Sequence, residues 1–260
     1  MYAFEIERPT SIADAVKALA ADEAQPLGGG QTLIPTLKQR LAMPSVLVSL
    51  SGINEMRGIC TDDTGRLCIG GGTTHVEVAA GAFPGLAGMA AKIGDPAVRN
   101  RGTLGGSLAN NDPSACYPAA ALGLGATIVT DSREIAADDF FQGMFDTALN
   151  EGEIITQVKF PVPAKSAYAK FEQPASRFAL VGVFVAKFEE GVRVAVTGAS
   201  ESGVFRWTEA EVALSGDFSA AALEGLSVAA DGMIGDLHGT PEYRAHLVGV
   251  MTKRAVTAAS

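Results

Sequence analysis

The chain has 260 residues, 47% of them hydrophobic and 19% charged, so it can bury enough apolar surface to offset its conformational entropy. This composition excludes global disorder. Acidic residues outnumber basic residues 29 to 20, and the resulting net charge of -9 excludes nucleic-acid binding through phosphate neutralisation. The longest apolar stretches, such as residues 118–129, are shorter than the roughly 20 residues that cross a bilayer, so we expect no membrane span.

The first residues, MYAFEIERPT, lack the basic start and the apolar run of a secretory signal. The three cysteines, Cys60, Cys68 and Cys116, form no CxxC pair, which suits a reducing compartment and supplies no iron–sulfur or zinc motif. We therefore expect a cytoplasmic protein with no metal site of its own.

The first half of the chain mixes helices and strands. Apolar residues at helical spacing predict a helix over residues 11–20, with Thr10 or Ser11 as its N-cap. A strand then leads into Gly28, and a helix that includes Leu33 and Leu41 follows the glycine loop. The same reasoning predicts strands over residues 46–50, 67–70 and 126–130 and helices over 84–93 and 119–124.

Antiparallel strands dominate after about residue 160. We predict strands over residues 168–171, 181–188 and 192–197, the last two joined as a hairpin across residues 189–191. Helices are predicted over residues 207–214, 220–230 and 241–259. Prolines punctuate residues 160–163, where we place a domain boundary.

Glycine is enriched, with 30 residues in the chain, and three glycine runs, at residues 28–30, 70–72 and 102–106, all lie within the first 110 positions. The segments PLGGGQTLIP and NRGTLGGSLANNDP combine glycines with hydroxyl and amide side chains, so their backbone N–H groups could together cradle a diphosphate. Alternatively, each loop is only a tight turn that needs glycine for its backbone conformation. Neither loop has the Walker A or the GxGxxG pattern, which disfavours the common nucleotide-binding folds.

These segments match a known family. GGGQTLIP, IGDPAVRNRGTLGGSLANNDP, GEIITQVKFPVP, YAKFEQPASRFALVGVFVA and the closing EYRAHLVGVMTKRAV resemble the FAD-binding medium subunit of molybdenum hydroxylases, the group of carbon monoxide dehydrogenase and xanthine dehydrogenase. The resemblance covers nearly the whole chain. It implies an α+β fold: a two-part FAD-binding domain of the vanillyl-alcohol-oxidase type (PCMH) over residues 1–160, with parts at about 1–55 and 56–160, followed by a smaller antiparallel-sheet-plus-helices domain over 161–260.

The resemblance also implies which residues bind the cofactor. The first loop would line the pyrophosphate, the second would hold the phosphate and ribityl chain, and Ile93, Ile155 and Lys170 would lie near the flavin ring. In full, the implied FAD-binding residues are Leu27, Gly28, Gly29, Gly30, Gln31, Thr32, Leu33, Ile34, Ile93, Thr103, Leu104, Gly105, Gly106, Ser107, Asn110, Asp112, Ile155 and Lys170.

This chain departs from the family pattern at two positions. Cys116 stands where many members carry an aspartate near the cofactor, and Ile93 stands where xanthine dehydrogenase has an aromatic residue. Asp112 contacts the ribose or caps the helix after Pro113. Neither glycine loop supplies a histidine or cysteine that could attach the flavin, so we expect noncovalent FAD, and we expect Cys116 to be a small, partly buried residue.

The remaining histidines and the tryptophan suggest no catalytic group. We expect His75 to cap or pack, His238 and His246 to lie at the surface, and Trp207 to be a buried anchor rather than an interface residue. No Ser-His-Asp order, HExxH or paired carboxylates indicate a hydrolytic site, and flavin chemistry resides in the cofactor.

The implied function is electron relay to NAD or another acceptor, with molybdopterin and [2Fe-2S] clusters on partner subunits only. The expected partners are an iron–sulfur small subunit and a molybdopterin large subunit, in a heterotrimer or its dimer. Two alternatives stay open: a self-sufficient flavin oxidoreductase of the same fold, and a nucleotide-binding module without redox activity.

Overall fold

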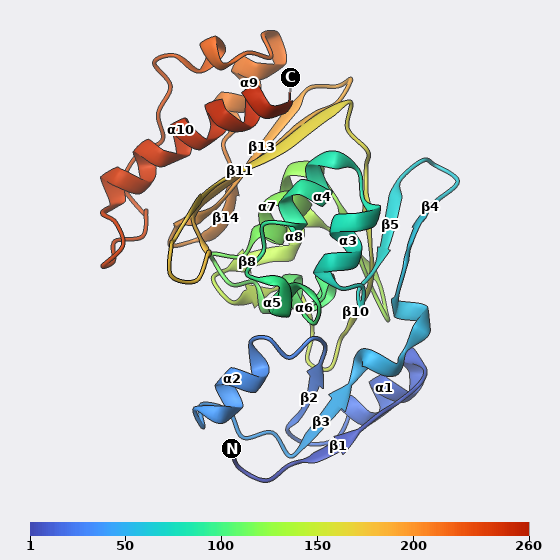
Figure 1. The fold of residues 1–260 in the computed structure, drawn as a ribbon. Coiled ribbons are helices and arrows are strands. Elements are labelled where there is room, and N and C mark those ends of the chain that lie inside the picture. The colour runs from blue at the N-terminus through green and yellow to red at the C-terminus, as the bar shows by residue number, and fades with distance from the viewer. Residues whose placement is uncertain (260) are drawn as a thin grey trace.

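The computed structural model describes residues 1–259, which form three sheets arranged one after another along the molecule (Figure 1). The N-terminal part, in blue, lies at one end, and α9 and α10 lie at the opposite end. Helices pack on all three sheets, so the predicted α+β class is confirmed.

The first sheet is small and parallel, in the order β1-β3-β2. Its elements are β1 (Glu5–Glu7), α1 (Ile12–Leu19), β2 (Ala24–Leu27), α2 (Leu33–Lys38) and β3 (Val46–Ser49). Ser11 caps α1 by accepting a hydrogen bond from the Asp14 N–H at 3.1 Å, and Ala15 and Leu19 bury the inner face of this helix. The predicted helix and its Ser11 cap are confirmed.

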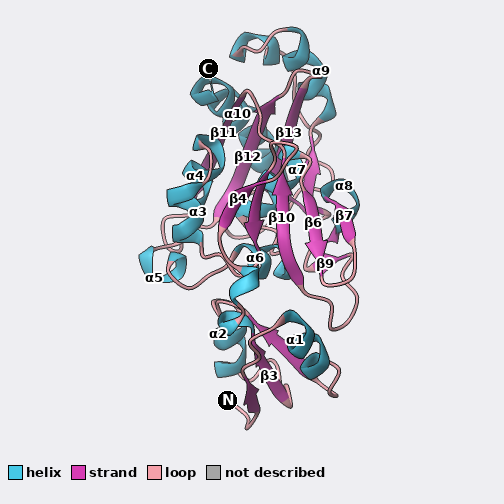
Figure 2. Ribbon diagram, turned by 90° about the vertical axis from the view of Figure 1, so that its right-hand side faces the viewer, coloured by secondary structure: helices cyan, strands magenta, loops and turns pink. Residues whose placement is uncertain are grey.

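The middle sheet has the order β4-β5-β10-β6-β7 and is antiparallel throughout. β10 lies at its centre (Figure 2). The strands are β4 (Ile59–Thr61), β5 (Leu67–Gly70), β6 (Thr127–Thr130), β7 (Glu134–Ala136) and β10 (Ile155–Phe160), and a separate hairpin comprises β8 (Phe141–Gly143) and β9 (Asp146–Thr147).

Six helices belong to this middle region: α3 (His75–Gly81), α4 (Pro84–Ala90), α5 (Pro96–Arg99), α6 (Leu104–Asn110), α7 (Cys116–Leu124) and α8 (Ala137–Phe140). Every residue of α7 is buried, because this helix is apolar all round and packs between two sheets. Short 3₁₀ turns at Leu50–Gly52 and Asn54–Met56 connect β3 to β4.

The third sheet is antiparallel, in the order β11-β12-β13-β14, with β11 (Lys165–Glu172), β12 (Ala179–Lys187), β13 (Val192–Ser200) and β14 (Gly203–Arg206). α10 (Pro241–Ala259) packs on β11 and β12, and α9 (Thr208–Gly216) packs on β13. α7 contacts β12 and β13 as well, so side chains of β12 enter two cores: Phe184 belongs to the α7 core and Val183 to the α10 core. The domain boundary near residue 160 stays a prediction.

Most of the predicted elements are confirmed, with ends that differ by no more than three residues. The helix predicted over residues 220–230 is wrong. Only Ala220–Leu223 forms a 3₁₀ turn, and Gly225 then adopts a φ of +78°, which ends regular helix. None of the helices within residues 1–259 is long and apolar enough to cross a membrane.

Candidate functional site

The two polar glycine loops, 72 positions apart in the sequence, meet in space. A Cβ added to Gly29 would overlap the carbonyl oxygen of Arg101 and lie 2.6 Å from the Cα of Gly102. A Cβ on Gly28 would lie 3.1 Å from Oγ1 of Thr103. Glycine is therefore required at Gly29, because only a residue without a side chain lets the two backbones approach so closely.

The first loop presents free backbone donors. It connects β2 to α2, and Gly30 has a φ of +72°, which turns the chain between them. Within residues 1–259, the amides of Gly28, Gly29, Gly30, Gln31 and Thr32 have no acceptor in the protein. Five neighbouring N–H groups without partners are a concave anion-binding surface of the kind that holds phosphate groups.

The second loop differs in how its amides are used. Leu104 donates its N–H to Thr73 O at 3.0 Å, Gly105 to Gly71 O at 2.8 Å and Gly106 to Oγ1 of Thr103 at 3.2 Å. Because these N–H groups already have acceptors, this loop contributes mainly side chains, together with the free N–H of Thr103, rather than a row of backbone donors. The expectation that both loops present free backbone donors is corrected for this part of the second loop.

The third glycine run supports the second loop and was not assigned a role from the sequence. Gly71 lies between β10 and α6: its N–H donates to Thr156 O at 2.8 Å, and a Cβ there would overlap the carbonyl oxygen of Ile155. A Cβ on Gly105 would in turn lie 2.8 Å from Gly71 O. Three consecutive glycines at the end of a strand were the signal that could have identified this contact.

A cavity of about 1350 Å³ lies along the meeting of the loops. It is larger than the roughly 300–1,000 Å³ typical of small-molecule pockets, so an extended ligand fits it. The sequence-predicted residues that line it are Leu27, Gly28, Gly29, Gly30, Gln31, Thr32, Leu33, Ile93, Thr103, Gly105, Gly106, Ser107, Asn110, Asp112, Ile155 and Lys170.

Two predicted residues do not line this cavity. Leu104 is fully buried in the core that surrounds α7, and Ile34 packs against the loop itself, where its Cγ1 would lie 3.0 Å from a Cβ on Gly30. Both are apolar residues at the start of short helices, so their side chains anchor the loops and do not face the ligand space.

A buried cation lies at the end of the cavity that Ile93, Cys116 and Lys170 line together. The Lys170 side chain is 1% exposed, and its Nζ donates to the backbone oxygens of Lys92 and Arg177, both at 2.6 Å. The Cys116 Sγ lies 3.9 Å from the same Nζ. Burial raises the pKa of the Cys116 thiol, which Lys170 opposes, so the Lys170 ammonium lies beside a neutral thiol, with the Glu172 carboxylate 4.0 Å from its Nζ.

Asp112 also lines the cavity and does not cap a helix. Its Oδ1 accepts a hydrogen bond from the Ser114 N–H at 2.8 Å, and its carbonyl accepts one from the Ala115 N–H at 2.9 Å. α7 starts two residues after Ser114, with Ala115 at its N-cap. The alternative role of Asp112 as N-cap is therefore wrong, and the carboxylate closes a turn instead.

The histidines and the tryptophan are placed largely as expected. His75 is 5% exposed and packs on Tyr117 with ring centroids 5.3 Å apart. His246 is exposed and His238 is half-buried, with its Nδ1 2.7 Å from Nε2 of Gln173. Trp207 is 2% exposed, which confirms a buried anchor.

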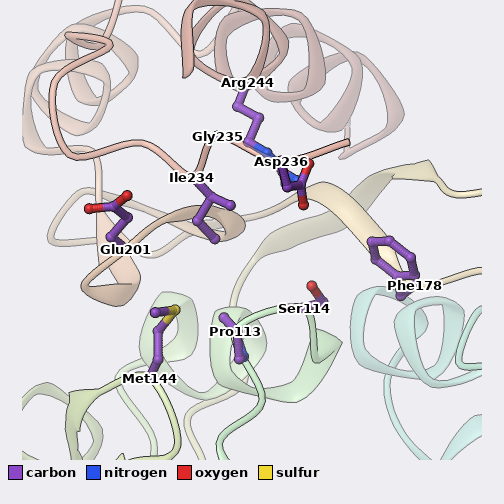
Figure 3. Close-up of a pocket in the computed structure, with 9 residues that line it drawn as sticks. All are labelled: Pro113, Ser114, Met144, Phe178, Glu201, Ile234, Gly235, Asp236 and Arg244. Atoms are coloured by element: carbon purple, nitrogen blue, oxygen red, sulfur yellow. The ribbon is translucent and has the colours of Figure 1, made fainter. Parts of the chain in front are cut away.

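A second cavity of about 540 Å³ adjoins the first through Ser114 and Phe178, which line both (Figure 3). Arg244 and Asp236 form an ion pair at 2.7 Å on its α10 side. The Arg244 guanidinium also donates to Leu180 O at 2.7 Å and Gly198 O at 2.6 Å. These bonds already pair the Arg244 guanidinium, and the Glu201 carboxylate and apolar residues such as Met144 complete the lining of this smaller cavity.

Comparison with known proteins identifies the family. Residues 2–163 match the family model described as the FAD binding domain in molybdopterin dehydrogenase. The chain is 33% identical to the carbon monoxide dehydrogenase medium chain of Afipia carboxidovorans, covering 97% of this chain and 95% of that one. It is 34% identical to the nicotine 6-hydroxylase medium subunit of Paenarthrobacter nicotinovorans, covering 96% and 95%.

The structure agrees with these sequence matches. A chain of the reconstituted CO dehydrogenase from Oligotropha carboxidovorans superposes with a TM-score of 0.90 at 32% identity, covering 99% of this chain and 98% of that chain. The two-part FAD-binding fold expected from the resemblance is therefore confirmed. The chain belongs to the FAD-binding medium subunits of the molybdenum hydroxylase family.

Proposed function

We propose that this subunit holds FAD noncovalently in the large cavity and relays electrons from an iron–sulfur subunit to NAD or another acceptor. The observation that carries the proposal is the row of five unpaired amides from Gly28 to Thr32, which faces the second loop across Gly29 and Arg101. These donors fit the diphosphate of a dinucleotide, because each oxygen needs hydrogen bonds to replace its hydration.

The other residues that line the cavity fall into a polar group and a mainly apolar group. Thr103, Ser107 and Asn110 offer hydroxyl and amide groups beside the diphosphate, and Asp112 offers a carboxylate. Ile93 and Ile155 supply apolar surface for a flat ring, and Lys170 supplies a buried positive charge there. When bound, the flavin accepts and donates the electrons, while the protein orients it and tunes its environment.

The proposed attachment is noncovalent because the thiol beside the ring end is a poor nucleophile. Cys116 is 6% exposed, and burial raises its pKa, which keeps it protonated. Acid precipitation should therefore release all the flavin into the supernatant. Flavin that stays with the precipitated protein would contradict this part of the proposal.

The proposed partners follow from the relatives, which are called medium chains or medium subunits. We propose an iron–sulfur small subunit and a molybdopterin large subunit, in a heterotrimer or its dimer. We also propose a cytoplasmic location, which the free thiols of Cys60, Cys68 and Cys116 support.

Anaerobic bleaching of the flavin tests the relay. The flavin absorbance of the isolated subunit should stay constant when substrates of the related dehydrogenases are added, and should fall once the partner subunits are present. Turnover of a substrate by the isolated chain would favour a self-sufficient flavin enzyme. A colourless chain that cannot be reconstituted with FAD but binds another nucleotide would favour a binding module without redox activity.

A further inference from the structure

The imidazole of His75 lies directly behind the second glycine loop. Its backbone N–H donates to Gly102 O at 3.0 Å, and its side chain lines the large cavity although it is only 5% exposed. A Cβ on Gly102 would lie 2.5 Å from Nε2 and 2.8 Å from Cδ2 of this ring. Gly102 is therefore held between Gly29 of the first loop and the Nε2 edge of His75.

The protonation state of His75 follows from its surroundings. Burial, followed by the nearby charge of Arg99, lowers the pKa of His75 to about 4, so the ring is neutral at neutral pH. Its Nδ1 is buried without a hydrogen-bond partner. A buried N–H without an acceptor is rarer in proteins than a buried acceptor without a donor, so the single proton belongs on Nε2.

The second loop needs a donor of this kind. The amides of Leu104, Gly105 and Gly106 are already paired within the protein. The donors left on this side of the cavity are the Thr103 N–H and side chains, and the Nε2–H of His75 lies on the edge that faces Gly102, which in turn contacts Gly29 of the first loop. Because Gly102 has no side chain, only its backbone lies against the Nε2 edge.

We propose that His75 is a further cofactor-binding residue, which donates its Nε2–H to a diphosphate oxygen and keeps Gly102 in contact with the first loop. This inference rests on the proposed function, because it presumes a diphosphate between the two loops. The family resemblance drawn from the sequence did not include His75 among the implied FAD-binding residues.

Two substitutions separate the hydrogen bond from the packing. In the full-length chain stripped of flavin, His75→Gln keeps an N–H donor near the position of Nε2, whereas His75→Met keeps the bulk without a donor. We expect His75→Met to weaken the binding of both FAD and ADP by about tenfold or more, the effect of one hydrogen bond to a charged oxygen. Riboflavin, which has no phosphate, should bind equally to wild type and variant.

Two further variants, His75→Gln and Tyr117→Phe, are compared with His75→Met. His75→Gln should bind FAD and ADP within about threefold of wild type, since the donor is retained. Tyr117→Phe is the matched control, because its hydroxyl is also buried without a partner and its ring packs near the His75 ring, but Tyr117 does not line the large cavity; it should leave all three affinities unchanged. Equal loss of FAD, ADP and riboflavin binding in His75→Met would overturn the inference, as would no loss at all.

A second measurement tests the contact with Gly102. Gly102→Ala should weaken FAD binding, because its Cβ meets the His75 ring, and the double variant with His75→Ser should lose less affinity than the two single losses added together. Strictly additive effects of the two substitutions would overturn this contact. If the wild-type chain itself binds neither FAD nor ADP, the proposed function fails first, which distinguishes that result from a failure of His75 alone.

Discussion

The carbonyl oxygen of Arg101 occupies the space that a side chain on Gly29 would need. This contact joins the two glycine loops, which both line the cavity but come from different parts of the chain, one before α2 and the other before α6. The first loop supplies free amides and the second supplies polar side chains, so the contact brings two complementary sets of donors to one ligand.

Gly29→Ala should abolish flavin binding. The added methyl group must push residues 101–102 away, and the backbone there cannot yield as a flexible side chain would. We expect the purified variant to contain less than about a tenth of the flavin of wild type, since a strained contact of a few kcal/mol exceeds the 1.4 kcal/mol of a tenfold change. The ratio of absorbance at 450 nm to that at 280 nm measures this occupancy.

Gly88→Ala is the control for that experiment. Gly88 lies in α4 with no atom within 4 Å of the added Cβ, so alanine should raise the free energy of unfolding by about 0.5–1 kcal/mol. Its flavin content should equal that of wild type. If Gly29→Ala retained full flavin content, the loops would not meet as described.

Lys170→Met should weaken flavin binding and lower the flavin midpoint potential. The substitution removes a buried positive charge and leaves the carbonyls of Lys92 and Arg177 without their donor, which costs about 2 kcal/mol or more. A negatively charged reduced cofactor loses more from this than a neutral oxidised one. Spectroelectrochemical titration measures the potential, and Lys165→Met, on an exposed residue of the same strand, is the control. An unchanged potential would place the ring away from Lys170.

The stability of the flavin-free chain should fall as the pH is lowered from 6.5 towards 4.5. His75 has a pKa of about 4 in the folded protein, against 6.5 when unfolded. Between pH 6.5 and 4.5 the His75 ring is therefore increasingly protonated in the unfolded state but stays mostly neutral in the folded state. At pH 4.5 this difference removes about 2 kcal/mol of unfolding free energy. Urea unfolding at several pH values should show this loss in wild type and a flatter profile in His75→Gln. Parallel profiles would mean that His75 is not held neutral by burial.

Arg244→Met should destabilise the third sheet severely. The arginine side chain is 2% exposed and bonds the carbonyls of Leu180 and Gly198 together with Asp236 (Figure 3). Removing it leaves buried acceptors unpaired, at a cost of about 3–5 kcal/mol. Asp236→Asn should cost only about 1 kcal/mol, because this carboxylate is one-third exposed. Fluorescence of the single tryptophan, Trp207, reports unfolding of this layer; equal effects of the two variants would contradict the assignment.

Local patterns in the sequence were enough to predict many single elements. Apolar residues at helical spacing predicted α1 and α10, and alternating or continuous apolar runs predicted β12 and β13. The prediction failed at residues 224–230, where the apolar pattern continued but Gly225 turned the backbone out of the helical region. The spacing of apolar side chains identifies the apolar face of a possible helix. It does not show whether the backbone there adopts helical dihedral angles.

By itself the sequence determined many of the longer strands and helices and the glycine loops, because those choices depend on neighbours a few residues away. Only the tertiary structure decided that Gly29 meets Arg101, that Gly71 pairs with Gly105, and that His75 lies behind Gly102. The sequence does not distinguish a glycine whose N–H is free to bind a ligand from one whose N–H already donates to a carbonyl oxygen. Which of the two holds is settled by which distant backbone folds against it.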